Sequence, residues 1–422
     1  MVYLLEEKFQ IDFLLNSGYK ECYLEVIPHY PNRHPANNSI CAVYCKPFVK
    51  DKLGSSKGYI IPIKHMDASN HVSINEINTL IKKFNKVWVR DKKSTLHFFP
   101  SNNITQANTY IQKNTQPISQ ILSYKLKDKP VNYIVPIVKL YEECELNFEK
   151  IKEGIKPLSK YDKFLNEKAS LVFFKIESAG LKVNKDTFEE YFHPIEGDKV
   201  YTQYNLHTMT SRPSNKFNGV NYAALNKENG CRASFIPSND KLVEIDVSAY
   251  HPNLICKLIG YKPPTQDIHA HFAELYGVEY KASKELTFKQ LYGGVFKEYE
   301  HIEFFKRVKE YVGMLWRHFE EVGYIEETIS GKRFVKGEVE NPNKQKLFNY
   351  LLQATETSMN CLVLWEVLSI LSSYNTKLVL YTYDSILIDL DESEVGVLEK
   401  INKVFEKFEL LTTTKGGYNY EF

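Results

Sequence analysis

The sequence predicts an α+β fold, in which a small α/β domain precedes a larger domain of antiparallel strands and long helices. Over residues 1 to about 140, short runs rich in β-branched and aromatic residues alternate with helical segments. Farther along the chain, two hydrophobic runs over 241–247 and 377–389 predict strands, with long helical patterns between them. The second run is interrupted at 383–385, where a tight hairpin turn fits.

The elements of the N-terminal part follow from local patterns. Strands are expected over 39–45, 58–63 and 86–90. Ser73 followed by Glu76 predicts a capping box that begins a helix over 73–84. A charged, helix-favouring stretch from about residue 137 to 192 comes next and is broken by glycine and proline. In the C-terminal part, helices are expected over 268–277, 283–292, 298–322 and 344–371.

Composition places the chain among ordinary globular proteins and excludes several classes. Its 422 residues allow two or three domains, and hydrophobic and charged residues make up 43% and 25%. The net charge of +2 excludes a global basic field, so a nucleic-acid surface must be local. Seven cysteines without CxxC spacing indicate reduced, mostly buried thiols. The N-terminus is acidic and no long apolar run is present, so we expect a cytosolic protein. No GxxxxGK[ST] loop is present, which excludes an ATP-driven helicase.

Two residue patterns point to chemistry. Asp246 and Asp384 each lie at the end of a predicted strand, and if the fold brings them together they can hold two divalent cations roughly 3.5–4 Å apart. Lys284, Phe288 and Tyr292 recur every fourth residue and so share one helix face. A cation and two rings in a row can neutralise a triphosphate and stack on a base, although such a stripe is more often part of a core.

In combination, these motifs resemble the family-A DNA polymerases of the bacterial polymerase I type. The segment 246–255 resembles the family's first metal-binding motif, 284–293 is similar to its KxxxFxxxYG helix, and 383–385 stands where its His-Asp-Glu hairpin lies. Smaller resemblances follow in the family's order, from 199 to 422, at 200–214, 218–221, 231–235, 267–277, 329–333, 349–353 and 414–420. The resemblance implies a right-hand polymerase palm built on an antiparallel sheet, with helical fingers.

The resemblance also assigns a role to each matching residue. The metal ligands, for two Mg²⁺ ions that Mn²⁺ can replace, are Asp246, Asp384 and the backbone carbonyl of Val247, and the two aspartates are the catalytic residues. The nucleotide-binding residues are Arg232, His251, His269, Lys281, Lys284, Phe288 and Tyr292. The residues that bind template or primer are Arg212, Asn221, Asn349, Gln353 and Tyr383.

Several positions depart from the family pattern. Tyr280 replaces an arginine that binds the triphosphate, a role that Lys281 can take, and His251 replaces the glutamate that excludes ribonucleotides. Tyr383 and Ser385 replace the histidine and glutamate of the hairpin, and a serine at the latter place is similar to the single-subunit phage RNA polymerases. These substitutions leave both dNTPs and NTPs open as substrates.

Compared with the family, this chain lacks most of the thumb and part of the nuclease site. Only a few residues separate the family's entry to the thumb from the palm, so the thumb is nearly absent and low processivity or a processivity partner is expected. The N-terminal part resembles a 3′-to-5′ exonuclease whose acidic motifs survive only at Glu25 and Asp91, while Ile137 stands where the third motif has its aspartate. We therefore expect no proofreading.

The predicted domain order has five segments. They are an exonuclease-like domain (1–145), a helical connector with a vestigial thumb (146–198), a first palm segment (199–262), fingers (263–340) and a second palm segment (341–422). The predicted function is a template-directed DNA polymerase that acts on a DNA primer-template and dNTPs, away from membranes, as in a phage or mobile element in a host cytoplasm. Two alternatives stay open: an RNA-synthesising polymerase or primase of the same fold, and a decayed nucleic-acid-binding scaffold.

Overall fold

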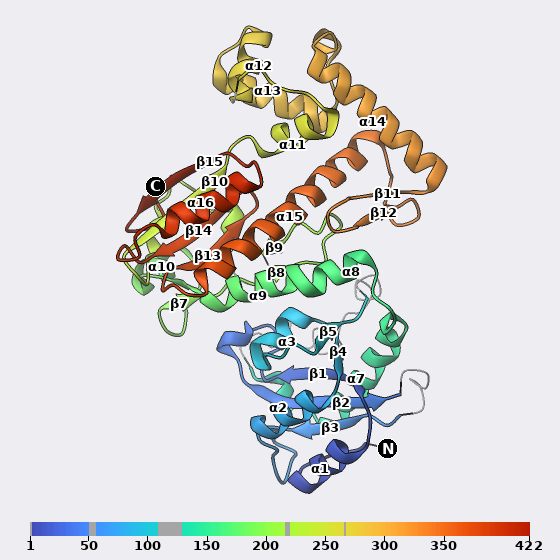
Figure 1. Cartoon of the computed structure of the whole chain (residues 1–422). Coiled ribbons are helices and arrows are strands. Elements are labelled where there is room, and N and C mark those ends of the chain that lie inside the picture. The colour runs from blue at the N-terminus through green and yellow to red at the C-terminus, as the bar shows by residue number, and fades with distance from the viewer. Residues whose placement is uncertain (1, 50–55, 109–128, 216–219, 266) are drawn as a thin grey trace. The chain divides into compact units, whose positions relative to one another are not determined.

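The computed structural model describes residues 2–49, 56–108, 129–215, 220–265 and 267–422 and confirms the α+β class (Figure 1). The chain forms two compact units. The N-terminal unit contains Met1–Ser178 and Tyr201–Gln203, and the C-terminal unit contains Ala179–Val200, Tyr204–Asn215 and Val220–Phe422. The finer division into five segments stays a prediction.

The N-terminal unit is built on a five-stranded mixed sheet in the order β3-β2-β1-β4-β5. β1 pairs antiparallel with β2, which pairs antiparallel with β3, whereas β4 and β5 continue the sheet in parallel. The strands are β1 (Glu21–Pro28), β2 (Ile40–Phe48), β3 (Tyr59–Pro62), β4 (Lys86–Val89) and β5 (Ile104–Gln106). β2 is buried over its whole length, because both faces of the sheet are covered.

Helices cover the two faces of this sheet. One core cluster joins residues of α1, α2 and α3 to Leu24 and Val43, and the other joins α7 to Tyr23 and Tyr44. The helices are α1 (Lys8–Asn16), α2 (Ile74–Lys83), α3 (Lys92–Phe98), α6 (Val131–Ile134), α7 (Ile137–Ile151), α8 (Lys160–Phe164) and α9 (Ser170–Ala179), with a π-helical turn over Leu165–Ala169. The capping box of Ser73 and Glu76 at the start of α2 is confirmed.

The C-terminal unit is built on a four-stranded antiparallel sheet in the order β13-β14-β10-β15. Its strands are β10 (Lys241–Val247), β13 (Lys377–Thr382), β14 (Ser385–Leu390) and β15 (Thr412–Gly417). Short pairs complete the unit: β6 (Leu181–Lys182) with β7 (Lys199–Val200), β8 (Tyr204–Asn205) with β9 (Ser214–Asn215), and β11 (Tyr324–Glu326) with β12 (Arg333–Val335). The predicted strands and the hairpin turn at Tyr383 are confirmed.

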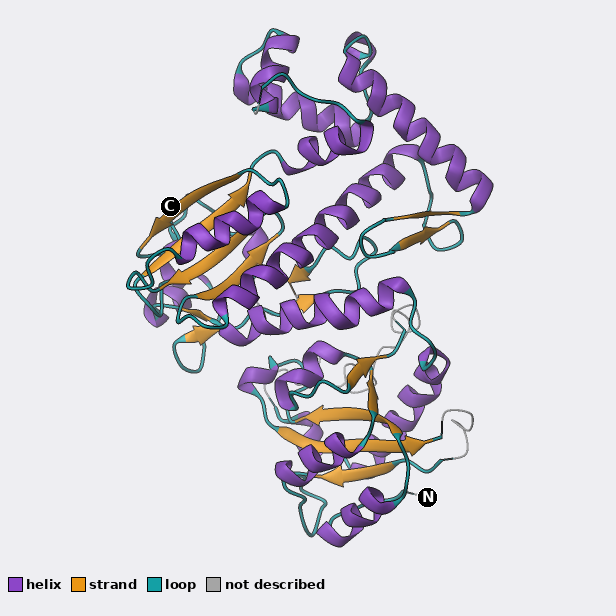
Figure 2. Cartoon of the chain, in the orientation of Figure 1, coloured by secondary structure: helices purple, strands orange, loops and turns teal. Residues whose placement is uncertain are grey.

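Some helices of this unit pack against the sheet and others extend beyond it (Figure 2). They are α10 (Lys185–Tyr191), α11 (Tyr250–Ile259), α12 (Ile268–Tyr276), α13 (Tyr280–Gly293), α14 (Glu303–Val322), α15 (Lys344–Leu371) and α16 (Val397–Lys407). α15 packs against β13 and α16 at one end, and its Phe348 and Leu352 pack with α11 to α14 at the other. α14 begins later than predicted, because the buried Ile302 is held in extended backbone just before it.

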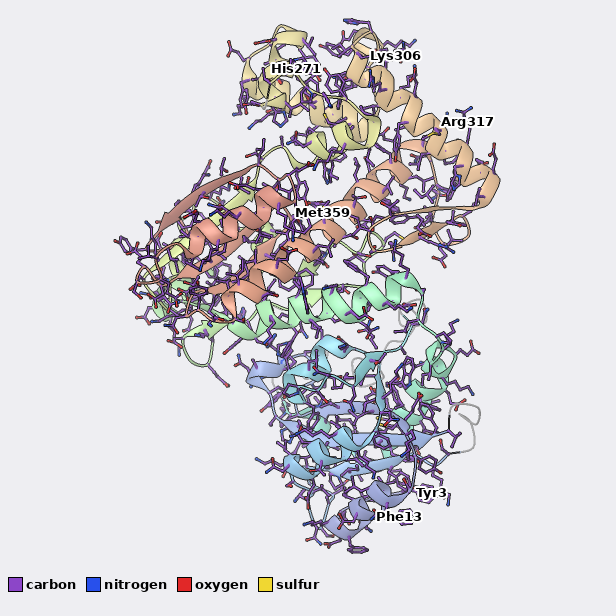
Figure 3. All side chains as sticks on the ribbon, viewed as in Figure 1. Tyr3, Phe13, His271, Lys306, Arg317 and Met359 are labelled. Atoms are coloured by element: carbon purple, nitrogen blue, oxygen red, sulfur yellow. The ribbon has the colours of Figure 1, made fainter. Side chains whose placement is uncertain are left out.

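Charged side chains line the outer surface of α14, where Lys306 and Arg317 are labelled in Figure 3. The seven cysteines are all free and buried, which confirms the expectation of reduced thiols. None of the helices among the described residues combines the length and the hydrophobicity that a membrane span requires.

Candidate active site

Asp246 and Asp384 lie beside each other at the same end of two neighbouring strands. In the antiparallel register of β10 and β14, Asp246 pairs with Ser385, the residue that follows Asp384. The next residue of β10, Val247, donates its backbone N–H to the carbonyl oxygen of Asp384 at 2.9 Å. The two aspartates that the sequence singled out, 138 residues apart in numbering (384 − 246), are thus brought together by one strand pair.

The pKa values of both carboxyl groups are raised. Burial, followed by the charges of Asp384 and Glu244, raises the pKa of Asp246 to about 6. The pKa of Asp384 is also raised, by burial and by Glu356, against the opposing effects of a hydrogen bond to its own backbone, Arg212 and His251. A carboxyl group whose ionisation is opposed by burial and by a neighbouring carboxylate is a candidate ligand for a divalent cation, which would offset that charge.

The backbone is strained next to each aspartate. Ala249, just after the end of β10, has φ 47°, and Tyr383, in the hairpin turn, has φ 61°. Residues other than glycine rarely adopt this left-handed conformation, and it tends to persist where the surroundings enforce it at functional sites. At Tyr383 the surroundings are specific: Asn360 Nδ2 donates to its carbonyl oxygen at 2.8 Å, and the guanidinium of Arg212 lies 3.8 Å from its ring centroid.

A buried carboxylate, Glu356 on α15, ties several predicted residues together. Its Oε2 atom lies 3.1 Å from His251 Nε2, and its Oε1 atom accepts from an Arg212 nitrogen at 3.3 Å. His251 also contacts the hydroxyl of Tyr292 through Nδ1. Burial, and then the charge of Glu356, raises the pKa of Tyr292 to about 12. Both ring nitrogens of His251 are therefore engaged by the protein, and the imidazole is held in one orientation.

The helix face of Lys284, Phe288 and Tyr292 belongs to the surface and not to the core. Phe288 and Tyr292 are each 37% exposed, and their rings are stacked, with centroids 5.9 Å apart and planes 4° from parallel. The Lys284 ammonium lies 4.7 Å from the ring centroid of Tyr280. The interior face of α13 is formed by other residues, namely Ser283, Thr287, Gln290 and Leu291. The interpretation as a core stripe is therefore wrong.

His269 faces this surface from α12. Its ring lies 5.9 Å from that of Phe288 and 6.3 Å from that of Tyr280, and the residue is only 4% exposed. Burial, together with the charge of Lys284, lowers its pKa. Among the described residues, none forms a hydrogen bond with His269 Nδ1. A buried ring nitrogen in this state is suited to a polar group of a ligand.

The residues predicted to bind template or primer are only partly brought together. Gln353 on α15 accepts from Thr210 Oγ1 at 3.2 Å, and Asn349 donates to the backbone carbonyl of Tyr292 at 3.3 Å. Asn221 is exposed at the start of a 3₁₀ turn, and Asn218 of the same motif lies outside the described residues.

Two predicted nucleotide ligands lie elsewhere or point outward. Arg232 stacks on the ring of Tyr420 at 4.6 Å, and Tyr420 donates to Glu244 on β10. Lys281 lies exposed on α13, at a different angular position from Lys284.

Sequence reasoning missed Glu356 and Asn360, although a signal for them exists. Asn349 and Gln353 are one turn apart on α15, and Glu356 and Asn360 continue the same face at helical spacing. Asn360 accepts from Tyr250 at 2.7 Å and donates to the hydroxyl of Tyr381 at 2.9 Å. The face links α15 to the strand ends that carry the aspartates.

Among known proteins, a similar structure is found, but no similar sequence. No protein-family model and no curated protein matches the chain. The structure is similar to the POL domain of Pol1 from M. smegmatis, which was solved in complex with DNA primer-template and dNTP. The TM-score is 0.71 at 10% sequence identity, and the alignment covers 99% of each chain. This chain therefore has the fold of a bacterial Pol I polymerase domain.

Proposed function

We propose that the chain is a template-directed DNA polymerase that transfers dNMP from dNTP to a primer 3′-hydroxyl. One observation carries the proposal: in a chain with a polymerase-domain fold, Asp246 and Asp384 are adjacent on the antiparallel pair β10–β14. The function belongs to the DNA-directed DNA polymerases, a class of nucleotidyltransferases. The proposed partners are a DNA primer-template and dNTPs.

Asp246 and Asp384, with the backbone carbonyl of Val247, are proposed to hold two Mg²⁺ ions, for which Mn²⁺ can substitute. The donor set fits these ions, because all its atoms are oxygens, the ligands that Mg²⁺ prefers. The raised pKa of Asp246 supports the same assignment, since a cation would offset the charge of Asp384 that causes part of the rise. When bound, such ions activate the 3′-hydroxyl and stabilise charge on the pyrophosphate.

The exposed face of α13 is proposed to receive the incoming nucleotide. Lys284, Lys281 and the unpaired nitrogen of His269 would bind phosphate oxygens, and Phe288 and Tyr292 offer stacked rings to the base and sugar. His251 is proposed to exclude a 2′-hydroxyl by its bulk. Its two nitrogens are engaged by Tyr292 and Glu356, so it acts as a fixed wall and not as a hydrogen-bonding partner of the sugar.

Arg212, Gln353 and Tyr383 are proposed to contact the primer-template. Arg212 is held by Glu356 and stacks on Tyr383, and its side chain remains 29% exposed, which leaves donors available for a phosphate. Asn349 and Asn221 are assigned to the same role, and Arg232 to the nucleotide, by resemblance alone.

Low intrinsic processivity is proposed on the basis of chain length. Only residues 192–198 separate the end of α10 at Tyr191 from the start of β7 at Lys199, which is too short for a helical thumb domain. A separate protein is proposed to supply the grip on duplex DNA.

The N-terminal unit is proposed to lack nuclease activity, because its two surviving acids are already engaged. Glu25 accepts from Tyr23 and Asn147, each at 3.0 Å, and pairs with Arg90 at 3.5 Å. Asp91 caps α3 by accepting from the backbone and hydroxyl of Ser94. A two-metal nuclease needs such oxygens free for cations, so a mismatched primer terminus should persist when the protein is incubated with Mg²⁺.

Primer extension tests the proposal and separates its alternatives. Purified protein is incubated with Mg²⁺, a primed or unprimed DNA template, and either dNTPs or NTPs. The proposal requires primed, template-matched incorporation of dNMP. Efficient unprimed RNA synthesis would instead favour a primase of the same fold, and tight primer-template binding without extension in Mg²⁺ or Mn²⁺ would favour a decayed scaffold.

A further inference from the structure

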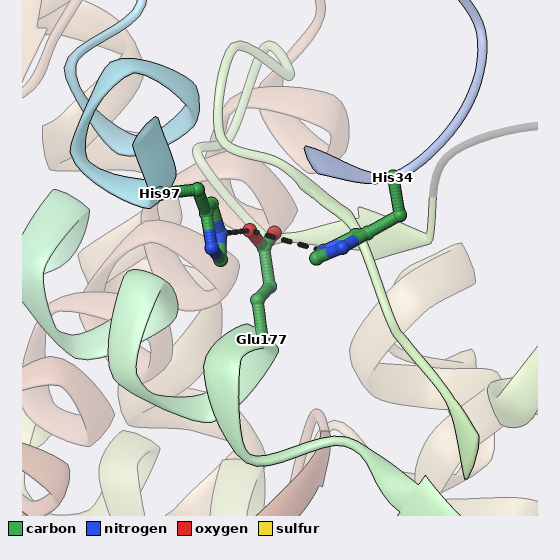
Figure 4. Close-up of side chains that lie close together, drawn as sticks. All are labelled: His34, His97 and Glu177. Atoms are coloured by element: carbon green, nitrogen blue, oxygen red, sulfur yellow. Dashed lines mark hydrogen bonds and ion pairs between the residues drawn. The ribbon is translucent and has the colours of Figure 1, made fainter. Parts of the chain in front are cut away.

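Three side chains that commonly bind metals converge in the N-terminal unit, far along the chain from the aspartates of the candidate active site. His34 precedes the 3₁₀ turn Pro35–Asn37, His97 lies on α3, and Glu177 lies on α9 (Figure 4). One ligand atom from each lies within 4.8 Å of the others. Their side chains are 9%, 5% and 0% exposed, so the cluster is held inside the unit.

Two of the three separations between ligand atoms lie near the value expected for ligands of a single cation. Glu177 Oε2 is 3.0 Å from His97 Nε2 and 4.0 Å from His34 Nε2. Nitrogen and oxygen ligands of tetrahedral zinc bind at roughly 2.0–2.2 Å and therefore lie about 3.3–3.5 Å from one another. The two measured separations fall on either side of this value. Small side-chain shifts would bring all three atoms to bonding distance from one ion.

The surroundings orient the ligands as those of a metal site do. Lys93 donates to Glu177 Oε1 at 2.6 Å, which leaves Oε2 as the oxygen that faces the two histidines. Burial opposes ionisation of Glu177, but Lys93 and His97 outweigh it and hold its pKa below the ordinary value. The ring of His34 stacks on Tyr201 with centroids 5.2 Å apart, and the ring of His97 packs edge-on against Phe174. Ligating carboxylates and imidazoles are typically fixed by such neighbours.

We propose that His34, His97 and Glu177 form a binding site for one Zn²⁺-like transition-metal ion. Two imidazole nitrogens and one carboxylate oxygen suit zinc, whereas Mg²⁺ and Ca²⁺ take oxygen ligands. With three protein ligands, the fourth position is left for water. The site is independent of the proposed polymerase chemistry and links the turn at His34, α3 and α9 within the N-terminal unit.

Metal binding has one local cost. The backbone N–H of Ala36 donates to His34 Nδ1 at 3.1 Å, so in the metal-free protein the ring carries its proton on Nε2. Binding through Nε2 moves that proton and gives up the hydrogen bond to Ala36. The turn at 35–37 is partly exposed and can adjust, since it is not part of the sheet.

Titration of the full chain with Zn²⁺ and with Co²⁺ tests the site. The protein is freed of metal with a chelator, and binding is followed by calorimetry and, for Co²⁺, by the visible absorption that marks tetrahedral coordination. The expected result is one tightly bound ion per chain, with affinity reduced at least 100-fold in His97→Gln and in His34→Gln. The control His301→Gln removes an exposed histidine and should bind as the unaltered chain does.

Two further measurements keep the test decisive. Circular dichroism of the metal-free variants should match that of the unaltered chain, and Zn²⁺ should raise the thermal midpoint only where all three ligands are present. Asp246→Asn combined with Asp384→Asn should leave zinc binding unchanged. The site would be refuted by the absence of stoichiometric binding, by equal binding in His97→Gln, or by loss of binding in the double aspartate variant instead.

Discussion

Replacing Glu356 with glutamine perturbs the buried network behind the proposed metal site. Glu356 is 1% exposed and receives hydrogen bonds from the neighbouring His251 and Arg212 at 3.1 and 3.3 Å. Glutamine keeps the shape and one acceptor oxygen but removes the charge. The variant therefore weakens these contacts without opening a cavity.

The magnitude follows from the type of contact that is lost. Hydrogen bonds to charged groups stabilise a protein by about 1.5–3 kcal/mol each. Because glutamine can keep one of the two, we expect the free energy of unfolding of the C-terminal unit to fall by about 1.5–3 kcal/mol. A second effect is electrostatic: Glu356 raises the pKa of Asp384, so its removal should lower that pKa and extend Mg²⁺ binding to lower pH.

Urea unfolding and Mg²⁺ titration over a pH series measure the two effects. Glu366→Gln is the matched control, because Glu366 lies on the same helix but forms an ion pair with Lys407 in which the two side chains are 35% and 63% exposed. Such a surface pair stabilises by about 0–1 kcal/mol. The reasoning would be refuted if the two variants lost equal stability, or if Glu356→Gln left the pH dependence of Mg²⁺ binding unchanged.

Four other predictions test separate parts of the structure. Mg²⁺ affinity should fall about tenfold per pH unit below about pH 6, because the pKa of Asp246 is raised to about 6 and only the ionised carboxylate binds the cation. Calorimetry across pH 5–8 measures this affinity, and a flat profile would contradict the prediction. His251→Ala should increase the use of NTPs relative to dNTPs in primer extension, whereas unchanged selectivity would remove its assignment as the sugar gate. Tyr204→Phe should lower the free energy of unfolding, measured in urea, by about 2–4 kcal/mol. The buried Tyr204 hydroxyl donates to the carbonyl oxygen of Tyr381 and accepts from the N–H of Tyr381, both at 2.9 Å. A loss below about 1 kcal/mol would show that water replaces the hydroxyl. Ser73→Ala should cost about 0.5–2 kcal/mol through loss of the cap of α2, measured in the same way, and no change would mean that the cap is dispensable.

Elements defined by local patterns could be predicted from the sequence. The helix over 344–371 follows from its residue pattern, and the hairpin at Tyr383 from the interruption of a hydrophobic run. The capping box at the start of α2 follows from the spacing of Ser73 and Glu76. The central strand β1 was not among the predicted strands, because Glu21 and Glu25 interrupt its apolar pattern. Both carboxylates accept hydrogen bonds from residues distant in sequence. Trp88 Nε1 donates to Glu21 at 2.7 Å, and Asn147 on α7 donates to Glu25.

In the candidate site, too, residues in local motifs could be predicted, whereas residues brought together only by tertiary packing could not. Asp246 and Asp384 could be proposed as a pair in advance, because each ends a predicted strand and each stands in a segment that resembles a metal-binding motif of the family-A polymerases. Glu356 was missed because a lone glutamate in a long helix reads as a solvated residue until its burial is known. The cluster of His34, His97 and Glu177 arises only when segments distant in sequence pack together, so no local pattern indicates it.

Single-turnover primer extension with the variants Asp246→Asn and Asp384→Asn tests the central claim most directly. The control Asp391→Asn alters an aspartate outside the proposed site, at the far end of β14, where it accepts from Ser393. The account predicts incorporation of the complementary dNMP by the unaltered chain and by the control. It predicts a loss of at least about a thousandfold, about 4 kcal/mol of transition-state stabilisation, in each of the two site variants. Extension at an unreduced rate by either site variant would contradict it.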